Sequence, residues 1–149
     1  MRKAQAVWNR GLQFVATSGS GHAIVIDGSP EDGGSATGPS NTELLLMALC
    51  GCTGMDIVTI LRKKRVAFDD FEVLAEGEVH TEPPKHFTHI RLTYRIWGDV
   101  PESALRQAIE LSQEKYCTVS ITLKGRAEVT AAYEINPEER GLANPQPPR

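Results

Sequence analysis

The sequence predicts an α+β fold, with antiparallel sheets around one long buried helix, and three observations support this prediction. Segments 71–82 and 87–97 alternate apolar and polar residues, as half-exposed antiparallel strands do. Segment 41–65 begins with a run that is apolar on every side, which is typical of a helix covered all round. Segment 100–115 has the spacing of a second helix with one apolar face.

The N-terminal part predicts three short strands, at residues 3–9, 12–17 and 22–27. The first two are joined by a turn-forming Asn-Arg-Gly sequence that contains Arg10. Residues 28–38 are rich in glycine and serine and cannot bury enough apolar surface to offset the entropy cost of ordering. We therefore expect a mobile loop at 28–38.

The long helix has a recognisable start. Ser40 followed by Glu43 three residues later is a capping-box signature, which makes Ser40 the N-cap of a helix that begins near residue 41. Small residues would let another backbone approach one face of this helix closely, and a partner subunit is one way to cover it. They are Ala48, Gly51 and Gly54.

The two central strands predict a charged outer face, because glutamates on the first strand could face arginines on the second. Segment 117–123 alternates like a strand, and segment 126–135 is expected to be the last strand. Residues 137–149 are polar and rich in proline, so we expect a disordered tail. Residues 1–136 would then form a single domain, since 149 residues are too few for two hydrophobic cores.

Charge and cysteine content narrow the class of protein. A net charge of −3 gives no basic surface of the kind that binds nucleic acid. The longest uninterrupted apolar run, 44–50, is far shorter than the roughly 20 residues that span a bilayer. Three cysteines without a signal peptide point to a reducing compartment. We therefore expect a cytoplasmic protein that binds neither nucleic acid nor a membrane.

The cysteines do not form a metal-binding pattern. Cys50 and Cys52 are two residues apart, about 200° round a helix, so their thiols point apart and cannot hold one ion. His80, His86 and His89 could gather a metal, but surface histidines are the simpler explanation. We expect no metal and no cofactor, and a packing role for Cys50. Cys52 and Cys117 differ from inert core thiols, because each opens a stretch of small polar residues.

Two segments carry a resemblance to a known family. "PSNTELLLMALCGCTGMDIVTILRKKR" and "LSQEKYCTVSITL" resemble the OsmC/Ohr superfamily of osmotically induced and organic hydroperoxide resistance proteins, in its OsmC-like subgroup. The resemblance implies an interlaced α+β homodimer whose long helix is buried within the dimer and whose sites lie at the interface. It also implies that Cys117 starts a short helix, against the strand that alternation predicts, and we adopt the helix.

The chemistry that the resemblance implies is thiol-based reduction of organic hydroperoxides. Cys52 would become a sulfenic acid, Cys117 would form a disulfide with it, and an external dithiol would restore both. In this family an arginine and a glutamate activate the first cysteine. Arg10 and Glu43 are the candidates, although the aligned glutamate position falls on residue 42 and Glu43 also suits the capping box.

Other interpretations of the sequence remain open, because the thiols could be weakly activated. Asp56 lies one turn after Cys52 and would, if ionised, oppose formation of a thiolate. A protein with weakly activated thiols could be a non-enzymatic redox sensor or could bind a small apolar ligand. The cysteines could also be structurally inert.

Overall fold

The computed structural model describes residues 2–125 and 127–138. Its contacts divide the chain into two compact units, which meet in sequence between Leu45 and Leu46. Residues 139–149, most of the expected disordered tail, lie outside the described residues. The single domain over 1–136 stays a prediction.

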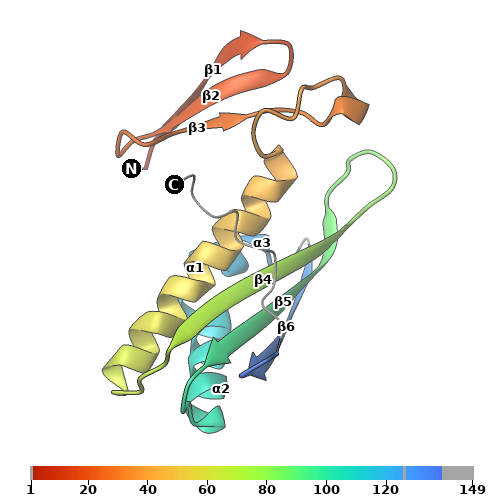
Figure 1. Cartoon of the computed structure of the whole chain (residues 1–149). Coiled ribbons are helices and arrows are strands. Elements are labelled where there is room, and N and C mark those ends of the chain that lie inside the picture. The colour runs from red at the N-terminus through yellow and green to blue at the C-terminus, as the bar shows by residue number, and fades with distance from the viewer. Residues whose placement is uncertain (1, 126, 139–149) are drawn as a thin grey trace. The chain divides into compact units, whose positions relative to one another are not determined.

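The N-terminal unit is a three-stranded antiparallel sheet, β1-β2-β3, as the sequence predicts (Figure 1). The strands are β1 (Ala4–Arg10), β2 (Gln13–Ser18) and β3 (Ala23–Ile26). Gly11, with a φ of +50°, occupies the turn between the first two strands, where the left-handed conformation favours glycine. Among the described residues of this unit only Gln13 and Asp27 are buried.

Asp27 organises the loop that follows β3. The residue is 3% exposed, and its carboxylate accepts hydrogen bonds from the backbone N–H groups of Gly28, Ser35 and Thr37 and from the Thr37 hydroxyl. The loop also contains a short 3-10 helix, η1 (Pro30–Asp32). The bond from the Thr37 hydroxyl is the main cause that lowers the pKa of Asp27 below its usual value. Sequence reasoning missed this anchor, and the mobility of the loop stays a prediction.

Helix α1 (Asn41–Lys63) starts where the capping box predicts. The Ser40 N–H and hydroxyl both donate to the Glu43 carboxylate at 2.7 Å, and these bonds lower the pKa of Glu43. By length and composition alone, α1 is long and apolar enough to cross a membrane, although its longest uninterrupted apolar run, 44–50, is too short to do so. In the second unit, however, it is a core helix that fully buries Leu49, Ile57 and Leu61.

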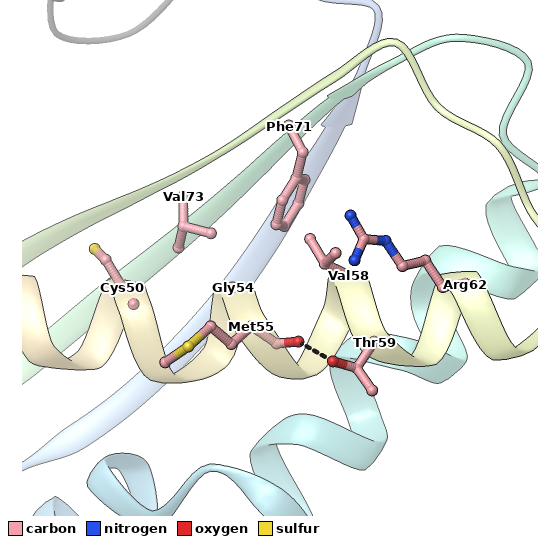
Figure 2. A pocket seen from close by; sticks show the side chains of 9 residues that line it. Cys50, Gly54, Met55, Val58, Thr59, Arg62, Phe71 and Val73 are labelled. Carbon is pink, nitrogen blue, oxygen red and sulfur yellow. Dashed lines mark hydrogen bonds between the residues drawn. The ribbon is translucent and has the colours of Figure 1, made fainter.

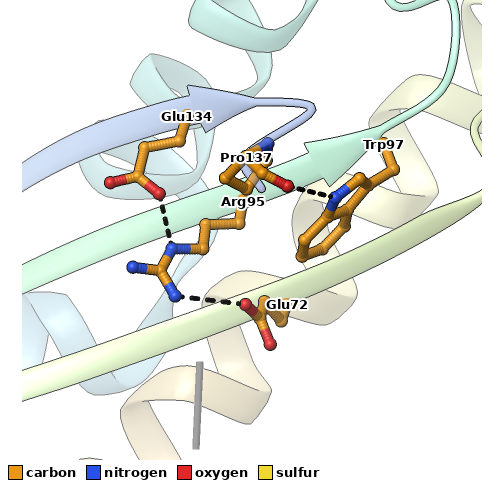
Figure 3. Close-up of polar contacts among 5 residues, drawn as sticks. All are labelled: Glu72, Arg95, Trp97, Glu134 and Pro137. Carbon is orange, nitrogen blue, oxygen red and sulfur yellow. Dashed lines mark hydrogen bonds and ion pairs between the residues drawn. The ribbon is translucent and has the colours of Figure 1, made fainter. Parts of the chain in front are cut away.

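The second sheet has the order β4-β5-β6 and lies beside α1 (Figure 1). Strands β4 (Asp70–Val79) and β5 (Phe87–Trp97) are antiparallel, and β6 (Glu128–Ile135) runs parallel to β5. The predicted glutamate–arginine pairs are confirmed. Arg95 donates to Glu72 at 3.5 Å and to Glu134 of β6 at 2.5 Å (Figure 3).

Helix α2 (Glu102–Leu111) buries the inner face that the sequence predicts, and a π-helical turn, η2 (Ser112–Tyr116), continues it. Cys117 is then the N-cap of α3 (Thr118–Leu123). The strand that alternation predicted at 117–123 was wrong, and the helix adopted from the family resemblance is confirmed. In a single helical turn Val119 and Leu123 pack four residues apart against the core, which alternation over so short a segment could not distinguish.

Candidate thiol site

Cys52 and Cys117, 65 positions apart in sequence, meet in the second unit. Their Sγ atoms and a carboxylate oxygen of Asp56 all lie within 4.8 Å of one another. Cys52 and Asp56 come from successive turns of α1, where an i, i+4 spacing puts both side chains on one face. Cys117 comes from the start of α3, so the packing of this short helix against α1 forms the site.

The two thiols differ in access to solvent. Cys52 is half-buried, whereas Cys117 is 0% exposed. Burial raises the pKa of Cys117 to about 11, and a side-chain hydrogen bond with Cys52 and the negative charges of Cys52 and Asp56 add to the rise. The Ser120 N–H donates to Cys117 Sγ at 3.4 Å and acts in the opposite direction. Cys117 is therefore a neutral thiol at neutral pH, while Cys52 is the thiol that a solute reaches.

A buried chain of hydroxyl groups supports Asp56. The Thr53 hydroxyl lies 2.8 Å from the Tyr94 hydroxyl and 2.9 Å from the Ser112 hydroxyl. Ser112 in turn donates to the Asp56 carboxylate at 3.0 Å. Thr53, Tyr94 and Ser112 are all fully buried, so each hydrogen bond holds its neighbour in place.

Gln113 extends this chain toward Cys117. Its amide donates to the Tyr94 hydroxyl at 2.8 Å and accepts from the Ser120 hydroxyl at 2.9 Å. Burial raises the pKa of Tyr94 to about 12, which keeps its hydroxyl protonated. Sequence reasoning did not find this network. The one feature of the sequence that could have indicated it is the presence of polar residues, such as Thr53 and Ser112, on helix faces that are otherwise apolar.

Cys50 points away from Cys52, as the helical spacing predicts. It lines a hollow of about 620 Å³ between α1 and β4, at the end opposite Arg62 (Figure 2). The hollow is mostly apolar, and burial raises the pKa of Cys50. Gly51 has open space at its Cβ position and Gly54 faces the side chain of Val73, so among residues 2–125 and 127–138 no second backbone packs against either glycine.

Arg10 and Glu43, the candidate activating residues, belong to the N-terminal unit, whereas both thiols belong to the second unit. Arg10 ends β1 and is exposed. Glu43 bonds Ser40 as the capping box requires, which gives it a structural role. Their activating roles stay predictions.

Within residues 2–125 and 127–138, Cys52, Asp56 and Cys117 form the one group of three or more possible metal ligands. The histidines do not gather there: His80 and His86 stack at 5.4 Å between ring centroids, and His89 contacts Glu128. The sequence indicated that Asp56 would oppose formation of a thiolate at Cys52. It did not indicate that the Asp56 carboxylate lies close to the sulfur atoms of both Cys52 and Cys117.

The chain matches the family of OsmC-like proteins over residues 33–132. Protein YhfA of Escherichia coli K12 is 40% identical over 134 residues, which cover 89% of this chain and 97% of YhfA. A hypothetical protein from Aquifex aeolicus VF5 is 29% identical, with a TM-score of 0.81 over 93% of this chain and 98% of that one. An organic hydroperoxide resistance protein from Legionella pneumophila, 16% identical, has a TM-score of 0.70 over 89% and 96%, which supports the fold alone. The chain therefore belongs to the OsmC-like protein family, which its two cysteine segments resemble.

Proposed function

We propose that this protein is a thiol peroxidase that reduces organic hydroperoxides, with Cys52 as the attacking thiol and Cys117 as the resolving thiol. The observation that carries the proposal is the meeting of two thiols within 4.8 Å in an OsmC-like fold, one reachable from solvent and the other fully buried. A peroxide can reach the half-buried Cys52, whereas Cys117 is accessible only to its neighbour.

The reaction proceeds in three steps. The Cys52 thiolate attacks the outer oxygen of ROOH, the O–O bond breaks, and the alkoxide takes a proton to leave as ROH while Cys52 becomes a sulfenic acid. Cys117 Sγ then attacks the Cys52 sulfur, and water leaves as the disulfide forms. An external dithiol reduces this disulfide and is itself oxidised. The high pKa of Cys117 keeps that thiol protonated until the second step.

We also propose that the protein is a cytoplasmic homodimer. The outward face of α1 exposes Met47, Met55 and Gly51, although an apolar helix face is normally covered. A second copy of the chain would cover this face, and Arg10 and Glu43 remain our candidates for activating Cys52 in the assembled protein. The three free cysteines suit a reducing compartment.

The test is a comparison of thiol loss with time in the reduced protein, with cumene hydroperoxide and hydrogen peroxide as oxidants. We expect rapid loss of two thiols per chain, faster with the organic peroxide, and a Cys52–Cys117 disulfide in the mass spectrum. Cys52→Ser should abolish the reaction. Cys117→Ser should stop at the sulfenic acid, which a dimedone probe traps, and Cys50→Ser is the matched control that keeps the wild-type rate.

Two outcomes would contradict the proposal. If both peroxides react no faster than they do with free cysteine, the protein is not a peroxidase. If the disulfide forms slowly but no dithiol supports turnover, the redox-sensor alternative replaces the enzyme.

A further inference from the structure

The thiol site contains a carboxylate that the peroxidase reaction does not need. Asp56 lies within 4.8 Å of both sulfur atoms. An ionised carboxylate so close to a thiol disfavours the thiolate, because the two negative charges repel. The position of Asp56 therefore works against the attacking group of a thiol peroxidase and requires another explanation.

We propose that the reduced site binds one thiophilic divalent cation, with Zn²⁺ as the best fit, through Cys52 Sγ, Cys117 Sγ and the Asp56 carboxylate. Two thiolates select a soft or borderline metal over Mg²⁺ or Ca²⁺, which prefer oxygen ligands. Three protein ligands leave one position of a tetrahedral ion for water or an outside ligand, as in catalytic zinc sites. The half-buried side of Cys52 is where this position would open.

The separations of the three donor atoms suit this ion. Tetrahedral Zn²⁺ with ordinary Zn–S and Zn–O bonds holds its ligand atoms about 3.5–3.8 Å apart. The three atoms already lie within 4.8 Å of one another, so each pair needs to close by about 1.3 Å at most. Cys52 and Asp56 already share one face of α1, and rotation of side chains provides a movement of this size.

The surrounding hydrogen bonds are those that orient metal ligands. The Ser112 hydroxyl donates to Asp56 at 3.0 Å, and the Ser120 N–H donates to Cys117 Sγ at 3.4 Å. Groups of this kind hold ligand atoms in place around an ion. Behind them the Thr53–Tyr94–Gln113 network fixes both donors, so two of the three ligands are prearranged.

Charge favours the same conclusion. Two thiolates and a carboxylate whose donor atoms lie within 4.8 Å of one another repel each other when no cation is present. A dication at the centre turns this repulsion into attraction. Binding then releases the thiol protons, as Zn²⁺ and two thiols give a zinc dithiolate and two protons.

Metal binding would regulate the thiols, and this consequence rests on the proposed function. A bound ion occupies the Cys52 sulfur and slows its attack on peroxide. Formation of the Cys52–Cys117 disulfide removes two of the three ligands, so oxidised protein cannot hold the ion.

The test is titration of the reduced, chelator-treated full chain with Co²⁺ under anaerobic conditions, followed by displacement with Zn²⁺. We expect one Co²⁺ per chain, with thiolate-to-cobalt charge-transfer absorption that Zn²⁺ abolishes. Cys52→Ser and Cys117→Ser should remove this absorption. Serine is a good N-cap, so the Cys117→Ser variant retains the start of α3. The matched control, Cys50→Ser, should behave as wild type.

Asp56→Asn separates the proposed site from a simple two-thiol site. We expect it to weaken Co²⁺ binding by more than roughly tenfold, since even outer-sphere partners of a ligand contribute roughly 10- to 100-fold. Absence of the charge-transfer absorption in wild type, its persistence in Cys52→Ser, or full affinity in Asp56→Asn would each overturn the proposal. The peroxide reaction is measured separately on metal-free protein, so loss of the metal site leaves the peroxidase proposal standing, and the reverse also holds.

Discussion

The two units of the chain differ in what they bury. The second unit has a hydrophobic core in which residues of α1, β5 and α2 are fully buried, among them Leu49, Leu92 and Leu105. In the N-terminal unit the buried residues among those described are Gln13 and Asp27, and both are polar. One unit is therefore organised by apolar packing and the other by hydrogen bonds.

The N-terminal sheet exposes apolar side chains on both faces. Direct pairing places Val7, Val15 and Val25 on one face, and each is at least 37% exposed. Trp8 and Phe14 lie on the other face and are also exposed. Three strands need a packed hydrophobic face to be stable in water. We infer that another protein surface covers this sheet, as the proposed homodimer would provide.

Four of the pKa shifts follow the same division. In the N-terminal unit, hydrogen bonds lower the pKa values of Asp27 and Glu43. In the second unit, burial raises the pKa values of Cys117 and Tyr94. Acid should therefore weaken the first unit, whereas the buried thiol and phenol of the second resist ionisation up to high pH.

The largest expected effect is in the core of the second unit. Leu49→Ala removes a fully buried side chain from α1 and should lower the free energy of unfolding by about 2–5 kcal/mol. Leu45→Ala, on the same helix but 44% exposed, is the matched control and should cost less than about 1 kcal/mol. Urea unfolding measures both. Equal losses of unfolding free energy would mean that a surface outside its unit buries Leu45. The contrast between a buried core in the second unit and exposed apolar residues elsewhere would then be wrong.

A charge placed on the N-terminal sheet should weaken association of the two copies of the chain in the proposed homodimer. Val15→Lys places an ammonium group between Val7 and Val25 on the same face of the sheet, so we expect a shift from dimer to monomer in sedimentation velocity. The thermal midpoint of wild type should rise with protein concentration, and that of the variant should not. Thr88→Lys, at an exposed position of β5, is the control. An unchanged dimer in Val15→Lys would show that this face is not covered by a second copy.

Deleting one buried hydroxyl should have a moderate effect. Tyr94→Phe removes one hydrogen-bond partner of Gln113 and one of Thr53, at a cost of about 1 kcal/mol in unfolding free energy. Tyr133→Phe, which removes a hydroxyl bonded to Glu102 on the exposed side, should cost less than about 0.5 kcal/mol. A cost for Tyr94→Phe no larger than that of its control would show that the network adds nothing to stability.

The sequence allowed prediction of features that depend on local signals. Ser40 and Glu43 marked the start of α1, and the alternation of β4 and β5 indicated that glutamates of one strand could face arginines of the other, as Glu72 and Arg95 do. The helix α3 came only from the family resemblance, since alternation over a few residues describes a strand and one helical turn equally well.

The remaining features depend on tertiary packing. Asp56 meets Cys117 only because α3 packs on α1, and no spacing in the chain encodes a contact between positions 61 residues apart. Asp27 accepts hydrogen bonds from residues 8 and 10 positions later, within a segment whose composition suggested no structure. Asp27 is a buried polar group and Asp56 a partly buried one, and periodicity of apolar residues detects neither.

The smallest expected effect is a response of the Asp27 loop to acid. Because folding lowers the pKa of Asp27, its stabilising contribution is present above the unfolded pKa, near 3.8, and is lost as pH falls through the folded pKa. Hydrogen exchange at the Ser35 and Thr37 amides, which donate to this carboxylate, should accelerate below about pH 4 relative to core amides of β5. Asp27→Asn should remove this pH step. An identical pH step in the variant would show that another group causes the acid response and that the hydrogen bonds to Asp27 do not.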